Sequence, residues 1–487
     1  MIRLSPAALA ALPADVARPA YDRAAAKRGV VHLGIGAFHR AHQAAVFEAA
    51  LASGDLRWAV TGASLRSPGV RDAMTPQDGL YALVARDGAA EQVQIIGAIR
   101  EVLVAPEDPA ALVAALADPD THIVTLTITE KGYHLDPATG ALIEDSPDVR
   151  HDLEDLSAPR TAPGFLVAAL ARRRAAGHAP FTAISCDNLP HNGARLEAAV
   201  AAIARRHDPA LADWIAAKGA FPQTMIDRIV PATTEEDIAA LGARIGVEDR
   251  AMVKTEPFTQ WVIEDRFAGP RPDFEALGVQ VTCAVAPWEE AKLRLLNGAH
   301  SGLAYLGGLA GVDFVHQFVE RPEGMRFVET LWDEAQTTLT PPAELDVAAY
   351  RTALMARFAN PALQHRTRQI AMDGSQKLPQ RLVAPILARR AKGQPIDRLA
   401  LAVAAWMRWQ GGVDDSGAAF VVDDPLAAET ARRTAGLGSA AERVRALAGI
   451  EAIFPPAFAA DGDIVAAVTA HLETIEAKGA LAAIAGA

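Results

Sequence analysis

The chain has 487 residues, of which 51% are hydrophobic and 22% charged, and its formal net charge is -12. This length predicts at least two domains, because a single hydrophobic core rarely grows beyond about 250 to 300 residues. The negative charge and the lack of a long basic run argue against nucleic acid as a partner, since phosphate binding needs a concentrated basic surface.

The apolar run nearest the N-terminus, residues 7–12, lies between two prolines and is too short for a secretory core region. No uninterrupted apolar stretch reaches the roughly 18 residues that span a bilayer. We therefore expect no membrane partner and a cytoplasmic protein. The two cysteines, Cys186 and Cys283, exclude a disulfide framework and a multi-thiolate metal site.

Strand-like and helical patterns alternate in the first half of the chain. Short apolar runs predict buried strands at 30–34, 58–65, 123–129 and 181–186. Helical patterns follow at 163–177 and 192–206. This α/β alternation predicts a doubly wound, mostly parallel sheet that is covered on both faces. The segment 80–104 departs from the pattern, because two strand-like runs flank Asp87-Gly88 as in a hairpin, and we interpret it as an insertion.

The first predicted strand runs into Gly34-x-Gly36 and then into a helix. This arrangement brings backbone amides up to a dinucleotide pyrophosphate. We predict that Gly34, Gly36, Ala37 and Phe38 bind the cofactor. His39 stands in place of the usual third glycine, which weakens the motif.

The same helix carries His39, Arg40 and His42, but no third ligand of suitable spacing is nearby, and we predict no metal. Arg40 is assigned either to a phosphate or to packing of this helix.

The second predicted strand lacks the carboxylate that usually holds the free ribose hydroxyls of NAD. The segment WAVTGASLRSP reaches Arg66, and the first acid is Asp72. Arg66 either meets a 2′-phosphate, stacks on adenine or faces solvent. The residues alone therefore leave NAD and NADP open.

Two later segments place polar groups next to predicted strands. SCDNLPHNG follows the fourth strand at the edge where doubly wound sheets bind ligands, and Asn188 is its best ligand candidate. Asn192 is more typical of a helix cap. In FPQTMIDRIVP, Asp227 and Arg228 lie in an apolar strand, where buried charges either pair structurally or serve a site.

Helical patterns dominate after residue 286. Before that point, Thr233 and Glu236 predict a capping box for one further helix. We predict a dinucleotide-binding domain at 1–286 and a mostly helical substrate and catalytic domain at 287–487. A small-molecule site is expected in the cleft between two domains.

The segment KLRLLNGAH places Lys292, Asn297 and His300 on one predicted α-helix. At about 100° per residue, Lys292 and Asn297 lie about 140° apart with His300 between them. A buried lysine with a lowered pKa can accept a proton from an alcohol, while an amide and an imidazole hold its oxygen. The alternative is a solvated basic face with packing residues.

Six segments in the same order, over nearly the whole chain, resemble the mannitol dehydrogenase family of polyol dehydrogenases. They are GIGAFHRAHQ, TITEKGY, SCDNLPHNG, FPQTMIDRIVP, KLRLLNGAHS and DGSQKLPQRL. The resemblance implies a Rossmann-type domain followed by a largely helical domain. It also implies a zinc-independent, nicotinamide-dependent reaction at C2 of a polyol or sugar acid, and it favours NAD as the cofactor.

The resemblance further implies that Lys292 is the general base, that Asn188 and Asn297 hold the reacting oxygen, and that His300 lines the substrate site. We add Asp227 to the expected cofactor contacts, together with Arg66. The missing acid after the second strand departs from the family pattern and leaves NADP open.

Within the family, TEKGY, CDNLPHNG and DGSQKLPQRL favour the branch that acts on D-mannonate and D-fructuronate over the one that acts on D-mannitol and D-fructose. The carboxylate of a uronate needs a cation, for which Arg366, Arg368 and Lys377 are candidates. We predict Lys377 first and Arg368 second as substrate residues. The alternative from another class is a non-catalytic dinucleotide sensor, which needs no proton acceptor. The oligomeric state, monomer or homo-oligomer, stays open.

Overall fold

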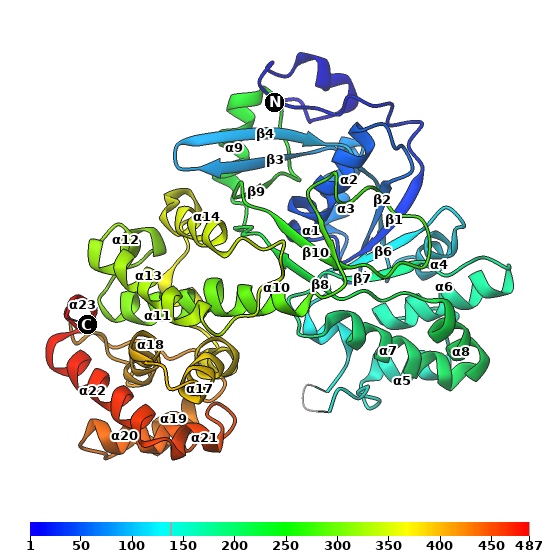
Figure 1. Ribbon diagram of the computed structural model, residues 1–487. Coiled ribbons are helices and arrows are strands. Elements are labelled where there is room, and N and C mark those ends of the chain that lie inside the picture. The colour runs from blue at the N-terminus through cyan, green and yellow to red at the C-terminus, as the bar shows by residue number, and fades with distance from the viewer. Residues whose placement is uncertain (137–138, 487) are drawn as a thin grey trace. The chain divides into compact units, whose positions relative to one another are not determined.

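The computed structural model describes residues 1–136 and 139–486 (Figure 1). The contacts divide the chain into two compact units, Met1–Val285 and Ala286–Ala487. The first unit combines strands and helices, and the second is mainly helical. No helix in these described ranges is long and apolar enough to cross a lipid bilayer.

A five-stranded parallel sheet forms the centre of the first unit. Its strand order is β5 (Ile99–Val104), β2 (Ala59–Ser64), β1 (Arg28–Leu33), β6 (Ile123–Leu126) and β7 (Thr182–Ser185). All neighbouring strands pair in parallel. The predicted parallel sheet of a doubly wound fold is therefore confirmed.

Both faces of this sheet are covered. Successive side chains of β1 point to opposite faces, so Val31 and Leu33 join one core and Val30 joins another. The first core also takes residues from α4 (Pro109–Ala117), α6 (Ala162–Ala175), α7 (Asn192–His207) and α8 (Pro209–Lys218). The second takes residues from α2 (Gln43–Ala52). Burial on both faces explains why β1, β2, β6 and β7 are rich in apolar residues and are buried along almost their whole length.

The segment 80–104 is only partly an insertion. β3 (Tyr81–Asp87) and β4 (Ala90–Ile96) form the predicted antiparallel hairpin, and β9 (Val253–Thr255) pairs in parallel with β3. The last strand of the segment, β5, instead pairs with β2 at the edge of the main sheet, so our interpretation of the whole segment as an insertion is wrong. β5 alternates buried and more exposed residues, and such a pattern does not distinguish an edge strand from a hairpin strand.

A second sheet lies beside the main one in the order β11 (Gln280–Thr282), β10 (Gln260–Glu264) and β8 (Thr224–Asp227). Its residues Ile226 and Trp261 belong to the same core as α2. The other elements of this unit are η1 (Pro6–Ala11), α1 (Ala37–Ala41), α3 (Gly69–Met74), η2 (Thr75–Gln77), η3 (Glu130–Tyr133) and α5 (Pro147–Glu154).

α9 (Glu235–Ile245) begins with a capping box one residue later than predicted. The Thr234 hydroxyl accepts from the Asp237 N–H at 3.3 Å, and the Asp237 carboxylate accepts from the Thr234 N–H at 2.9 Å. The prediction of Thr233 and Glu236 is wrong, because the Thr233 hydroxyl donates to the carbonyl of Met252.

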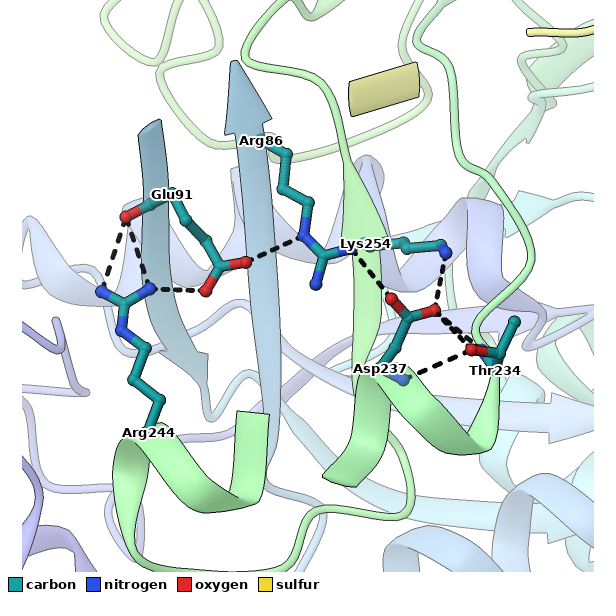
Figure 2. A network of polar contacts seen from close by, with 6 residues as sticks. All are labelled: Arg86, Glu91, Thr234, Asp237, Arg244 and Lys254. Carbon is teal, nitrogen blue, oxygen red and sulfur yellow. Dashed lines mark hydrogen bonds and ion pairs between the residues drawn. The ribbon is translucent and has the colours of Figure 1, made fainter. Parts of the chain in front are cut away.

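Asp237 also connects α9 to the hairpin and to β9 (Figure 2). Its carboxylate accepts from Lys254 at 2.6 Å and from Arg86 at 2.8 Å, and Arg86 also pairs with Glu91. Burial would raise the pKa of Asp237, but the hydrogen bonds from Lys254, the Thr234 backbone and Arg86 lower it below its ordinary value. The network therefore stabilises the charged carboxylate.

The second unit is built around α11 (Gly298–Leu309), in which every residue is buried. α13 (Pro322–Gln336), α15 (Thr367–Ile370) and α18 (Asp397–Trp409) pack against it, and α22 (Gly462–Lys478) packs on α18. A Cβ at Gly308 would lie 2.6 Å from the ring of Trp409, so only glycine allows this approach.

The remaining elements of the second unit complete a largely helical architecture, as predicted. They are α10 (Ala286–Ala291), η4 (Lys292–Asn297), α12 (Val315–Val319), α14 (Val347–Ala359), η5 (Pro361–Leu363), α16 (Gly374–Leu378), η6 (Pro379–Val383), α17 (Ala384–Ala391), α19 (Ala427–Thr434), α20 (Ala440–Ala448), α21 (Pro456–Ala460) and α23 (Ala480–Ala485).

Candidate active site

A pocket of ≈ 420 Å³ lies at the carboxyl ends of β1, β2 and β6 in the first unit. This is the edge where open parallel sheets bind ligands, and the volume is in the range of small-molecule sites. Gly34 and Gly36 line it, together with Ser64 and Arg66 from the end of β2. Gly34 has φ +93°, and a Cβ there would lie 2.1 Å from the Thr127 carbonyl oxygen, so this turn requires glycine.

Two further cationic side chains, Lys131 and Arg160, line this pocket besides Arg66. His134 also lines it, and burial lowers the pKa of its ring. One acid, Asp148, is in the lining and lies 3.9 Å from Arg160. Sequence reasoning missed these residues, although Lys131 lies in the TITEKGY segment. Positive charge at the glycine turn suits a ligand that carries phosphates.

The other predicted cofactor residues lie outside this pocket lining. Ala37 and Phe38 begin α1 and pack against the hydrophobic core, and the Phe38 ring stacks on His42 at 5.3 Å. Asp227 ends β8 with 6% of its surface exposed. Their assignment to the cofactor therefore stays a prediction.

The histidine in place of the third glycine is a packing residue. The rings of His39 and His32 stack at 3.4 Å, and both side chains are fully buried. Burial lowers the pKa of His32 to about 3 and that of His39 well below its ordinary value, so both are neutral. Arg40 donates to the carbonyls of Ala251 and Gly36, which favours packing over phosphate contact.

The loop after β7 is tied to the loop after β6. The Asp187 carboxylate accepts from the backbone N–H of Ile128 at 3.0 Å and of Thr129 at 2.9 Å, and from the Tyr133 hydroxyl at 2.6 Å. The next residue, Asn188, is exposed.

Asn192 has a structural role, but it is not the helix cap that its sequence context indicates, because α7 begins at Asn192 and its N-cap residue is His191. Its amide donates to the carbonyl of Asp187 and to Thr224, and its oxygen accepts from the Thr224 N–H at 3.0 Å.

Arg228 is also structural. It donates to the carbonyls of Ala41 and Glu256, and burial lowers its pKa to about 10. Because its donors point at backbone oxygens, Arg228 holds β8 in place rather than serving a ligand.

In the second unit, Lys292 and Asn297 lie on one π-helical turn, η4, rather than on the predicted α-helix. Hydrogen bonds in a π-helix join residues five apart, and π turns are frequent at functional sites. The Gly298 N–H correspondingly donates to the Leu293 carbonyl. The expected separation of about 140° is therefore wrong, because the wider turn brings residues five apart toward the same face.

Lys292, Asn297 and His300 are all buried, with 8%, 9% and 7% of their surfaces exposed. A second π turn, η6, packs against η4, and a Cβ at Gly298 would lie 3.1 Å from the carbonyl oxygen of Arg381. A neutral lysine amine held this way in a solvent-poor setting can accept a proton from a substrate hydroxyl, and the amide beside it can donate a hydrogen bond to the same oxygen.

His300 is neutral and incompletely hydrogen-bonded. Its ring lies 4.7 Å from that of Phe358 and 5.1 Å from that of His365. Burial lowers the pKa of His300 well below its ordinary value, and the neighbouring His365, Arg357, Arg381 and Lys377 lower it further. Within the described residues its Nε2 has no hydrogen-bond partner, which leaves this atom available to a ligand.

Of the two predicted substrate cations, only Lys377 is among the charged groups that lower the pKa of His300. Its ammonium donates to the carbonyls of Ile370 and Met372, and burial followed by the charge of Arg381 lowers its pKa. Arg368 is half-exposed, lies 3.6 Å from Asp414 and covers the ring of Phe420.

Sequence reasoning missed Arg381, which follows Lys377 by four residues in DGSQKLPQRL. Burial lowers the pKa of this guanidinium to about 10, and it donates to the Ser301 hydroxyl at 3.2 Å. Arg381 therefore adds a second partly buried cation to the His300 environment.

Comparison with known proteins covers both units. Residues 28–276 match the family described as the mannitol dehydrogenase Rossmann domain, and residues 284–476 match the mannitol dehydrogenase C-terminal domain. The D-mannonate oxidoreductase of Escherichia coli (strain K12) is 43% identical over 470 residues, which cover 96% of each chain.

Two solved structures are similar over the whole chain. The mannitol 2-dehydrogenase of Pseudomonas fluorescens, in a ternary complex with NAD and D-mannitol, is 38% identical with a TM-score of 0.84 and covers 100% of this chain and 99% of its own. A D-sorbitol dehydrogenase in substrate-free form is 33% identical with a TM-score of 0.93 and covers 99% of this chain and 100% of its own.

Proposed function

We propose that this protein, which belongs to the mannitol dehydrogenase family, is an NAD-dependent oxidoreductase that interconverts D-mannonate and D-fructuronate. The observation that carries the proposal is the set of buried groups around His300. Lys292 and Asn297 share a π turn. The buried Nε2 of His300 has no hydrogen-bond partner among the described residues, and the cations Lys377 and Arg381 are near this ring. A substrate hydroxyl suits Lys292, Asn297 and His300. A carboxylate on the same substrate suits the cations Lys377 and Arg381.

The first unit fits a dinucleotide. Gly34 leaves no room for a Cβ at the pocket, and Lys131 and Arg66 supply positive charge for phosphates. We propose Gly34, Gly36 and Arg66 as its contacts, with Ala37, Phe38 and Asp227 as outer candidates. NAD is favoured over NADP by the relative that was solved with NAD, although β2 ends without an acid.

We propose that Lys292 takes the proton of the C2 hydroxyl in oxidation and returns it in reduction. Asn297 donates a hydrogen bond to that oxygen as negative charge develops on it. Asn188 stays a candidate amide donor because of the family resemblance. His300, being neutral, orients a neighbouring hydroxyl through its Nε2. NAD, when bound, accepts the hydride from C2 in oxidation and supplies it in the reverse reaction.

We propose that Lys377 pairs with the carboxylate of the sugar acid, supported by Arg381. The carbonyl contacts of Lys377 hold its ammonium without neutralising it, since carbonyls carry no net charge. Arg368 is the weaker candidate, because Asp414 already lies beside it and half of its side chain is exposed.

The experiment compares kcat/KM for D-fructuronate and for D-fructose with NADH. We expect D-fructuronate to be preferred, and Lys377→Met to lower the fructuronate-to-fructose ratio by about 10 to 100-fold, the loss of one charge-assisted hydrogen bond. Arg368→Met is the matched control and should leave the ratio unchanged. A wild-type preference for D-fructose, or an unchanged ratio in Lys377→Met, would refute the uronate assignment.

The second candidate is a D-mannitol/D-fructose 2-dehydrogenase, which the similarity to a structure with bound D-mannitol favours. It needs the same proton acceptor but no carboxylate partner. A non-catalytic dinucleotide sensor is a third alternative, and the presence of Lys292, Asn297 and His300 in one buried segment argues against it, because a sensor needs no proton acceptor. NADH binding without turnover of either ketose would favour the sensor.

A further inference from the structure

Thr129 has an unusual backbone conformation beside the dinucleotide pocket. Six described non-glycine residues have positive φ, and five of them also have ψ between 33° and 43°, the ordinary left-handed region: Asp78, His134, His191, Gln364 and Asp373. Thr129 alone combines φ 65° with ψ 164°. That region is populated almost only by glycine, and a β-branched residue is especially unfavourable there.

The strained residue lies where the chain turns back on itself between β6 and η3. Thr127, Ile128 and Thr129 line the pocket before the turn, and Lys131, Gly132 and His134 line it afterwards. The conformation of Thr129 therefore determines how both arms of this bend face the pocket.

Asp187 is the group that holds both arms. One carboxylate oxygen accepts from the Thr129 N–H at 2.9 Å, and the other accepts from the Ile128 N–H at 3.0 Å and from the Tyr133 hydroxyl at 2.6 Å. The Tyr133 hydroxyl also contacts the Ser185 hydroxyl at 2.5 Å, in the last residue of β7. The three donors come from both sides of Thr129, so they fix the bend relative to the main sheet.

We propose that Asp187 is a positioning residue that keeps Thr129 in its strained conformation and so shapes the dinucleotide pocket. The inference rests on the proposed function in one respect, that the pocket binds a nicotinamide dinucleotide. Asp187 itself does not line the pocket in the described residues. It acts through the bend, and it immediately precedes Asn188, the proposed amide donor.

The chemistry of the side chain explains why an acid is needed. All three donors point at carboxylate oxygens, and each oxygen is in use. An asparagine of the same size has one acceptor oxygen, and its NH₂ group would face a backbone N–H. Asp187→Asn therefore releases one arm of the bend, and Thr129 can relax to a favoured conformation.

The test is a double-mutant cycle read by NADH binding in the absence of substrate, followed by NADH fluorescence. Asp187→Asn should raise the Kd for NADH about tenfold, the expected loss for a hydrogen bond to a charged group. Thr129→Gly is the reference for the double variant, because glycine adopts this conformation freely and because its own Kd reports what the loss of the Thr129 side chain does to the pocket. In the double variant, the Kd should stay within about threefold of that of Thr129→Gly.

Because the Kd is measured on folded protein, the rescue reports the shape of the pocket rather than a general loss of stability. Asp155→Asn is the matched control: its carboxylate also accepts a backbone N–H, from Ser157 at 2.7 Å, and Asp155 is not among the residues that line the pocket. It should leave the Kd unchanged.

A rise of less than about fivefold in Asp187→Asn, or a double variant that binds as weakly as Asp187→Asn, overturns the inference. If Asp187→Asn does not fold, the double variant decides: a folded double variant that binds NADH supports the inference, and an unfolded one overturns it. Wild-type protein that binds NADH but reduces neither ketose refutes the proposed substrate and leaves the cycle valid. Wild-type protein that binds neither NADH nor NADPH overturns both proposals.

Discussion

Replacement of Lys292 by alanine is the most direct test of the proposed proton transfer. Only 8% of the Lys292 surface is exposed, so water has little access to replace the missing acceptor. General acid–base groups contribute about 10² to 10⁴ in rate, and for such a buried group we expect the upper part of that range, about 10³ to 10⁴ in kcat. The Kd for NADH should stay within about twofold, because the proposed role of Lys292 is toward the substrate hydroxyl and not toward the dinucleotide.

Lys292→Arg distinguishes proton transfer from simple charge. Arginine keeps the positive charge, but its guanidinium stays protonated near neutral pH because of its very high pKa, so it cannot act as a base. We therefore expect Lys292→Arg to be about as slow as Lys292→Ala. The assay is the initial rate of NADH formation from D-mannonate over a range of pH, in which the wild type should gain activity as the lysine loses its proton.

Arg294→Ala provides the matched control on the same π turn. Arg294 pairs with Glu290 and donates to the Thr338 carbonyl, so its charge is used structurally. We expect its kcat to change less than about threefold. The reasoning is refuted if Lys292→Arg retains more than about a tenth of the wild-type kcat, or if Lys292→Ala loses less than about tenfold.

Three further predictions concern the oxyanion, the cofactor and stability. Asn297→Ala should lower kcat by about 10² to 10³ with little change in KM, and a rise in KM alone would make Asn297 a ground-state binding group. The kcat/KM for NADH should exceed that for NADPH; a reversed preference that Arg66→Ala abolishes would show that Arg66 binds a 2′-phosphate. Asp237→Asn should cost about 1 to 3 kcal/mol of unfolding free energy at pH 7, because the contacts of Lys254 and Arg86 with the carboxylate lose their charge assistance. The folded-state pKa of Asp237 is lowered. The wild type should therefore be more stable than Asp237→Asn above the unfolded-state pKa of about 3.9, and this difference in unfolding free energy should shrink as the pH falls below that value. Urea melts over a range of pH measure it.

The fold was predictable where burial is two-sided. β1, β2, β6 and β7 are short apolar runs because both faces of the sheet are covered, and Gly34 marks the first turn by a conformation that only glycine accepts. Sequence reasoning did not assign β5 to the main sheet. Buried and exposed residues alternate along an edge strand as they do along a hairpin strand, so the pattern does not tell the two apart. The capping box shifted by one residue, because the hydroxyl of Thr233 is used by Met252, a contact between residues distant in sequence.

The candidate site was predictable in its residue types but not in its geometry. Lys292, Asn297 and His300 occur in one segment, so sequence reasoning groups them. The π turn that carries the first two has no distinctive residue pattern, because it depends on how η4 packs against η6. The cations around His300 come from α14, α16 and η6, and only folding brings these separate segments together.

The π turn gives the spacing of Lys292 and Asn297 a chemical meaning. On an α-helix, residues five apart point in clearly different directions, and one oxygen could not meet both side chains without a distortion of the substrate. On η4 the spacing of five matches the hydrogen-bond repeat, so an ammonium and an amide can converge on the same atom. A π turn is less stable than an α turn, and here the buried packing of η4 against η6 and α11 stabilises it. The proposed proton acceptor and oxyanion donor would therefore owe their alignment to the core of the second unit, and a change that restored α-helical geometry at η4 should reduce turnover without removing either functional group.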